Sequence, residues 1–251
     1  MDPDDWAEKV ERFTHAHANP GAGFDAAMRE IRAGRKVGHW IWYIFPQLEG
    51  LGRSSAAARF ALADADEAWA YVAHPLLGAR LALAFETVDQ HPGSLHELMA
   101  DPVDARKLVS SLTLFHAVCQ LHLADADALL AARALSITMT SHRVLKKAAR
   151  EGLPKCAFTL QSLPAAQTCG ACGTEPAPLV VASGVAPVSY PRCVDCQLDS
   201  VEGEWVWKLV LQSAADLGLP DMAGQKTMVD GKYLSWDEWL QLRVADPAGE
   251  A

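Results

Sequence analysis

The chain lacks several features that would assign it to a common class. No stretch approaches the ~20 consecutive apolar residues that span a bilayer. The first residues, Met1–Trp6, are acidic and lack the basic and apolar parts of a secretory signal peptide. Also absent are a Walker loop, an HExxH motif and the Ser–His–Asp order of serine hydrolases. We therefore expect a cytoplasmic protein without a membrane segment.

Long β-branched runs are scarce in residues 1–155, where alanine and leucine dominate. This composition favours helices. Apolar periodicity and capping residues such as Asp64 and Glu67 predict helices over 5–17, 22–33, 64–72, 76–90, 94–100, 104–122, 125–135 and 140–152. The apolar run 39–45 is too short to assign by periodicity. We expect a mainly α protein with a compact multi-helix N-terminal domain.

The acidic excess lies mostly in the second half of the chain. Of the net charge of −9, residues 1–155 contribute −2 (17 basic, 19 acidic) and residues 156–251 contribute −7 (5 basic, 12 acidic). Nucleic-acid binding needs clustered cations, so this balance makes it an unfavoured function. One basic stripe has helical spacing and is expected to be a solvated face, with an anionic partner as the minority interpretation: Arg143, Lys146, Lys147 and Arg150.

After Gly152 the sequence changes to proline, glycine, valine and paired cysteines, which indicates short strands and turns. A helical pattern returns over 202–217, and a capping box that begins at Ser235 predicts a short last helix to about Arg243. We therefore expect three parts: an all-helical domain (1–152), a β-rich zinc ribbon (153–200) and a C-terminal helical segment (201–251).

Two CxxC pairs in the second part predict a structural zinc site. Each pair directs two thiolates at one point, as tetrahedral zinc requires. Four cysteines leave no open position for a catalytic water. Disulfides are less favoured because the chain lacks a signal peptide and has two further cysteines, Cys119 and Cys156. The predicted zinc ligands are Cys169, Cys172, Cys193 and Cys196.

The segment 34–52 combines cations, aromatic residues and glycines more densely than the rest of the chain. Together with later motifs it resembles the domain-of-unknown-function 1810 family, over roughly residues 8–120. The matching motifs are Gly34-Arg-Lys36, His39-Trp-Ile-Trp-Tyr-Ile-Phe-Pro-Gln47, Gly50-Leu-Gly52, Ala73-His-Pro75 and Lys107-Leu-Val-Ser-Ser-Leu-Thr-Leu-Phe115. The resemblance implies a compact all-helical domain and carries no established activity. It does not extend to the zinc ribbon.

The residues of these motifs divide into expected core and expected site. Aromatic and aliphatic side chains usually bury area, so the predicted core residues are Trp40, Trp42, Ile44, Phe45 and Phe115. A cationic and hydroxyl-bearing set would suit a phosphate or carboxylate. Its predicted ligand-binding residues are Arg35, Lys36, Gln47, Lys107, Ser110 and Ser111, with His39 as the candidate catalytic acid–base.

Each site residue also has an ordinary structural interpretation. Arg35 and Lys36 could be a solvated helix cap, and His39 a hydrogen-bonded structural histidine. The hydroxyls of Ser110 and Ser111 could bond back to the preceding helical turn. Taken together, the residues favour a small anionic ligand, nucleotide-type or phosphorylated, in a possible hydrolase or transferase. The alternative is a non-enzymatic module that docks to a protein partner through the acidic zinc-ribbon half.

Overall fold

The computed structural model describes residues 3–122, 126, 128–163, 226–229 and 232–235. The chain divides into two compact units, Met1–Glu204 and Trp205–Ala251. All of the described helices belong to the first unit, and the described strands belong to the second. Within these described ranges, the helices lack the combination of length and apolar character needed to cross a membrane.

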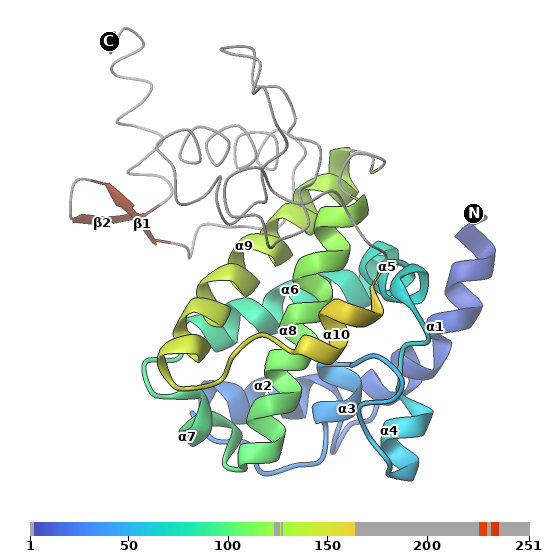
Figure 1. The fold of residues 1–251 in the computed structure, drawn as a ribbon, viewed down its shortest axis with the longest axis horizontal. Coiled ribbons are helices and arrows are strands. Elements are labelled where there is room, and N and C mark those ends of the chain that lie inside the picture. The colour runs from blue at the N-terminus through green and yellow to red at the C-terminus, as the bar shows by residue number, and fades with distance from the viewer. Residues whose placement is uncertain (1–2, 123–125, 127, 164–225, 230–231, 236–251) are drawn as a thin grey trace, which may run out of the picture. The chain divides into compact units, whose positions relative to one another are not determined.

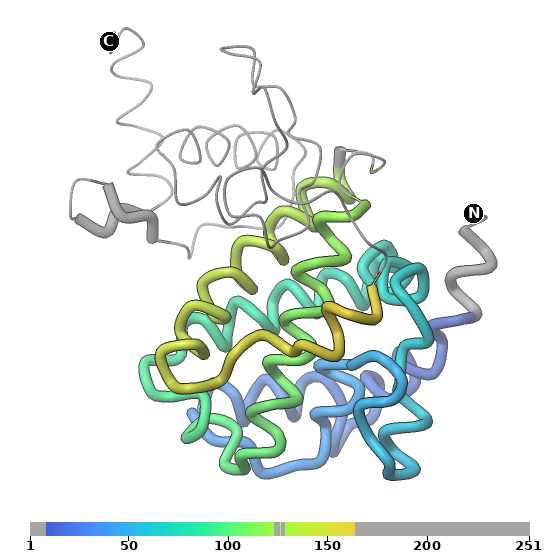
Figure 2. Tube along the Cα trace, in the orientation of Figure 1, coloured from blue at the N-terminus to red at the C-terminus, as the bar shows by residue number. Residues whose placement is uncertain are grey.

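The first unit is mainly helical, as the composition predicted (Figure 1). The described helices are α1 (Pro3–His17), α2 (Phe24–Arg32), α3 (Ile41–Ile44), α4 (Ser55–Arg59), α5 (Ala65–Ala73), α6 (Pro75–Asp89), α7 (Leu95–Met99), α8 (Pro102–His122), α9 (Ala128–Arg150) and α10 (Ala157–Ser162). Helix α8 packs against α5, α7, α9 and α10, and α6 packs against α2, α5 and α9. Figure 2 shows the path of α10 across α8.

Local capping signals account for several helix ends. The side chain of Asp64 accepts a hydrogen bond from the Glu67 amide at 2.8 Å and begins α5 as predicted. Ser94 and Glu97 form a reciprocal capping box at the start of α7. Gly34 follows the end of α2 with a φ of +79°, a conformation that glycine adopts without steric strain.

Helix α9 differs from the sequence prediction of two helices over 125–135 and 140–152. Hydroxyl-bearing and β-branched residues, which have modest helix propensity, lie between the two predicted helices. In the structure the hydroxyl of Thr138 donates to the Ala134 carbonyl at 2.8 Å, and that of Ser141 donates to the Ile137 carbonyl at 2.7 Å. Both side chains therefore bond within a continuous helix. The short helices α4 and α10 were also not predicted, and α10 lies where strands were expected.

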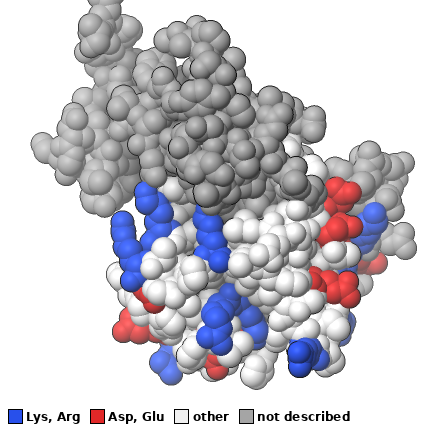
Figure 3. Space-filling model, in the orientation of Figure 1, with Lys and Arg blue, Asp and Glu red and all other residues white. Residues whose placement is uncertain are grey.

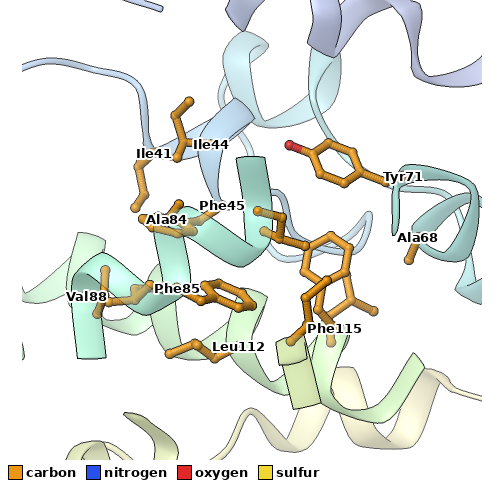
Figure 4. Close-up of a cluster of buried hydrophobic side chains, with 14 of the residues drawn as sticks. Ile41, Ile44, Phe45, Ala68, Tyr71, Ala84, Phe85, Val88, Leu112 and Phe115 are labelled. Atoms are coloured by element: carbon orange, nitrogen blue, oxygen red, sulfur yellow. The ribbon is translucent and has the colours of Figure 1, made fainter. Parts of the chain in front are cut away.

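An aromatic cluster forms the centre of the first unit (Figure 4). The ring of Phe45 stacks on Phe85 at 5.6 Å between centroids, and Phe85 meets Phe115 edge-on at 6.3 Å. Tyr71 packs against Phe115 from α5. The expected core positions Trp40, Ile44, Phe45 and Phe115 are all buried, which confirms those assignments.

The second unit contains an antiparallel hairpin of β1 (Lys226–Val229) and β2 (Lys232–Ser235), with Lys226 opposite Ser235 and Val229 opposite Lys232. The sequence between the strands is Asp-Gly, which is typical of two-residue hairpin turns. This hairpin was not predicted. The helix expected over 202–217, residues 236–243 of the last expected helix and residues 164–200 of the expected zinc ribbon lie outside the described residues, while Ser235 ends β2.

Candidate functional site

Glu30 organises the first part of the 34–52 segment. Its Oε2 atom accepts hydrogen bonds from the amides of Val37 (2.7 Å) and Gly38 (2.8 Å) and from the indole nitrogen of Trp40 (2.6 Å). Burial alone would raise the pKa of Glu30, but these donors outweigh it and hold the pKa below its usual range. The carboxylate therefore fixes the loop and explains why buried Trp40 has a partner for its N–H.

Lys36 is a buried ion-pair partner and not a solvated cap. Its side chain is 7% exposed, and its ammonium lies 2.7 Å from Oδ2 of Asp104. The same ammonium donates to the Gly38 carbonyl at 2.6 Å, and the Lys36 amide donates to Leu98 at 2.7 Å. Lys36 thus connects the segment to the N-terminal end of α8.

Lys107 shares the same carboxylate. Its ammonium lies 2.7 Å from Oδ1 of Asp104 and 3.6 Å from the centroid of the Trp42 ring. Burial alone would raise the pKa of Asp104, but hydrogen bonds from Lys107 and Lys36 outweigh it, and the pKa of Asp104 lies below its usual range. Two ammonium groups and one carboxylate leave this cluster with a positive charge. We refer to Lys36, Asp104 and Lys107 as the lysine cluster.

Gln47 links the lysine cluster to the loop that follows α3. Its side-chain amide donates to the Lys107 carbonyl at 3.2 Å. The backbone carbonyl of Gln47 accepts a hydrogen bond from the Leu62 amide at 2.9 Å, and the backbone amide of Glu49 donates to the Leu62 carbonyl at 2.9 Å. The residues around Leu48 are thereby held against Leu62 in a parallel β-bridge.

A cavity of about 220 Å³ opens beside this loop. Its lining combines two aromatic rings with small and polar residues: Trp42, Gln47, Leu48, Glu49, Gly50, Gly52, Ala57, Ala58, Phe60 and Ala61. We refer to it as the Trp42 cavity. The sequence analysis assigned Trp42 to the core. In the structure Trp42 is only partly buried: it lines this cavity, and its ring also contacts the Lys107 ammonium.

The other predicted site residues lie in different surroundings. The side chains of Arg35 and His39 are exposed and do not line the Trp42 cavity. The hydroxyl of Ser110 donates to the Arg106 carbonyl at 3.0 Å. Ser111 is fully buried, and its hydroxyl has no hydrogen-bond partner among the described residues. The structure therefore brings together Lys36, Gln47 and Lys107.

Two residues near the site were not singled out from the sequence. Asp104 could have been found as a partner of Lys107, because residues at i and i+3 share a helix face. Cys156 was treated only as a leftover cysteine. Burial alone would raise its pKa, but the nearby Ser110 and Thr159 hydroxyls and the backbone at the start of α10 lower the pKa of the thiol overall. Its amide donates to Thr113 at 3.1 Å.

The basic stripe of α9 is partly used within the first unit. Arg143 pairs with Asp89 at 2.7 Å, and the Lys147 ammonium donates to the His91 carbonyl at 2.7 Å. Lys146 and Arg150 are exposed. Figure 3 shows Lys and Arg side chains over the left and centre of one face, with most of the visible Asp and Glu near its right edge and a smaller group at its lower left. The stripe is therefore less cationic than its sequence suggests.

Among the described residues, His, Cys, Asp and Glu form no group that could hold a metal ion. The predicted zinc ligands Cys169, Cys172, Cys193 and Cys196 lie outside those residues.

Comparisons with other proteins place the chain in a family. Comparison with curated proteins gives no match. Among solved structures, the chain is similar to the conserved hypothetical protein Rv1873 from Mycobacterium tuberculosis. The two are 35% identical over 65% of this chain and 99% of that one, with a TM-score of 0.48. A family model described as protein of unknown function (DUF1810) matches residues 7–134. That match spans half of the chain and confirms the resemblance seen in the motifs: the protein belongs to the DUF1810 family of proteins of unknown function.

Proposed function

We propose that the protein binds a small anionic ligand that lies in the Trp42 cavity and places its anionic group at Lys107. One observation carries this proposal. Trp42 lines the cavity, and its ring centroid lies 3.6 Å from the ammonium of Lys107, a residue just outside that lining. A ligand that contacts Trp42 from the cavity would therefore have a cation at the neighbouring position. Gln47 supports the same arrangement, because it lines the cavity and bonds to the Lys107 carbonyl.

The charges within the lysine cluster favour an anion over a cation at Lys107. Asp104 faces two ammonium groups, so the lysine cluster has one positive charge in excess. An ammonium has three N–H donors, and among the described residues that of Lys107 hydrogen-bonds only to Asp104. Its side chain is 18% exposed, which leaves it accessible and only partly hydrated. Hydrogen bonds from such a group to a phosphate or carboxylate are charge-assisted and strong.

The remaining predicted residues would have secondary roles. Lys36 would hold Asp104 in place and so position Lys107. Arg35 and His39 are exposed and could meet only a part of the ligand that extends out of the cavity. A hydrolase or transferase activity with His39 as the proton carrier stays a prediction. It requires that His39→Ala abolish turnover of a bound ligand without weakening its binding.

The first test of the anion site is the substitution Lys107→Gln, which removes the charge and keeps most of the side-chain length. Loss of a charge-assisted hydrogen bond worth ~1.5–3 kcal/mol should weaken phosphate-ligand binding by about tenfold to a hundredfold. Isothermal titration with ribose 5-phosphate and nucleoside monophosphates measures this change.

Arg106→Gln is the matched control for this experiment. It removes the same charge from the neighbouring position of α8, where the side chain is exposed. Its affinity should stay within about twofold of the original protein, since distant exposed charges are screened by salt. Equal losses in the two variants would mean that overall charge, and not the lysine cluster, governs binding.

A structural zinc ion in the second half of the chain remains part of the proposal. Purified protein should contain about one zinc per chain, because four cysteine thiolates complete a tetrahedral site. Elemental analysis of the original protein and of Cys169→Ser measures the stoichiometry. A fully folded, zinc-free protein would remove this proposal. Protein docking through the acidic half concerns the same residues and stays a prediction.

A further inference from the structure

The Trp42 cavity has the volume and the aromatic lining to accept one ring system. Trp42 and Phe60 provide aromatic walls, and Ala57, Ala58 and Ala61 contribute only a methyl group each. Its volume of about 220 Å³ lies below the ~300–1,000 Å³ typical of sites that enclose a drug-sized ligand. One ring system therefore fits, and the rest of a larger ligand must lie outside.

Hydrogen-bond acceptors line the same cavity. Gln47 is 9% exposed, and its bond to the Lys107 carbonyl fixes the amide orientation because a carbonyl can only accept. The Oε1 atom of Gln47 accepts no hydrogen bond from the described residues. The Glu49 carboxylate is likewise without a hydrogen bond or ion pair to that part of the chain.

The backbone around these acceptors is already held in place. Two hydrogen bonds to Leu62, one accepted by Gln47 and one donated by Glu49, fix the loop that carries both side chains. Gly50 follows with a φ of +93°, and a Cβ there would lie 2.9 Å from the ring of Phe158. The backbone that carries the two acceptors therefore needs little rearrangement when a ligand binds, which favours binding.

We propose that the ligand carries a planar heteroaromatic ring with N–H donors, which enters the Trp42 cavity and donates to Gln47 and Glu49. This inference rests on the proposed function, because the ring and the anionic group at Lys107 are parts of one ligand. Aromatic walls suit a flat ring of any kind. The excess of acceptors selects a ring whose edge bears N–H groups, as in an amino-substituted purine.

The test uses the full chain and four probes in isothermal titration. Guanosine 5′-monophosphate has the ring, the N–H donors and the anion, guanosine lacks the anion, and ribose 5-phosphate lacks the ring. Purine riboside keeps ring and sugar without N–H donors. We expect guanosine 5′-monophosphate to bind at least about tenfold tighter than ribose 5-phosphate, and guanosine about tenfold tighter than purine riboside.

Substitutions in the cavity test the contribution of the ring to affinity separately from that of the anionic group. Ala58→Leu fills the cavity from an exposed position of α4 and should weaken guanosine binding at least about tenfold while leaving ribose 5-phosphate unchanged. Ala56→Leu, on the same helix and outside the cavity lining, is the control and should change neither. Glu49→Gln should weaken guanosine binding and spare purine riboside.

The outcomes distinguish this inference from the proposed function. If ribose 5-phosphate and guanosine 5′-monophosphate bind equally well, and Lys107→Gln weakens both, the ring inference is wrong and the anion site stands. If guanosine binds as tightly as its monophosphate and Lys107→Gln has no effect, the anion site is wrong and the ring inference stands. Absence of binding by all four probes overturns both.

Discussion

Replacing Lys36 with methionine should lower the free energy of unfolding by about 3 kcal/mol, as expected when one partner of a buried ion pair is removed. The side chains of Lys36 and Asp104 are 7% and 14% exposed, so solvent screens this pair only weakly. The substitution also removes the hydrogen bond to the Gly38 carbonyl. Lys107 would still neutralise Asp104, which keeps the loss at the lower end of the range for buried pairs. Urea denaturation of the full chain measures the change.

Arg35→Met is the matched control for this prediction. It removes a positive charge from the adjacent residue, whose side chain is exposed, and should change the unfolding free energy by no more than about 0.5 kcal/mol. If the two variants lose stability equally, the contrast between a buried and a solvated cation in this segment is incorrect.

Acidification should destabilise the first unit through His17. Burial lowers the pKa of His17 to about 4. Its Nε2 atom lies 2.8 Å from the Tyr43 carbonyl and must carry the proton there, because a carbonyl only accepts. The Nδ1 atom is buried without a partner among the described residues, so a second proton would have no acceptor.

The lowered pKa of His17 determines how stability changes with pH. The unfolded state binds a proton near pH 6.5 and the folded state only near 4, so stability is complete above pH 6.5 and declines as the pH falls between these values. The full loss is about 3 kcal/mol, of which about 2 kcal/mol should be gone between pH 7 and pH 5.

Urea denaturation across this pH range measures the loss, with His17→Gln as the comparison. Glutamine keeps an N–H donor for the Tyr43 carbonyl and does not titrate, so the pH dependence of its stability should be shallower by about 2 kcal/mol from pH 7 to pH 5. Other histidines with a lowered pKa, His74 and His91, contribute equally to both proteins and cancel. Parallel pH profiles would show that His17 is not responsible.

Much of the helical fold could be predicted because helix ends depend on neighbouring residues. Asp64 begins α5 and Gly34 follows α2 as expected, since caps act within one turn. The continuous helix α9 was wrongly predicted as two helices, because local hydrogen bonds do not decide its middle. Its threonine and serine hydroxyls can bond locally either to break a helix or to continue one, and packing against α8 decides between them.

The site was only partly predictable, because its geometry depends on contacts between distant parts of the chain. Lys36 and Lys107 were expected to face an anion, and Gln47 was named with them. Helix spacing could have paired Asp104 with Lys107, but nothing local indicated that Lys36 would reach the same carboxylate. The roles of Trp40 and Trp42 could not be separated either, since α3 spans only Ile41–Ile44 and the surrounding run is too short to show which residue faces inward.

The central claim is that the 34–52 segment divides into a scaffold around Trp40 and a ligand wall at Trp42. The most direct test compares the affinity for guanosine 5′-monophosphate of Trp40→Phe and Trp42→Leu by titration. Trp40→Phe removes the donor to Glu30 in the core, so it should lower the unfolding free energy by about 2 kcal/mol and leave affinity within about twofold. Trp42→Leu should weaken binding at least about tenfold with a much smaller effect on stability. Unchanged affinity in Trp42→Leu, or a greater loss in Trp40→Phe, would contradict the division.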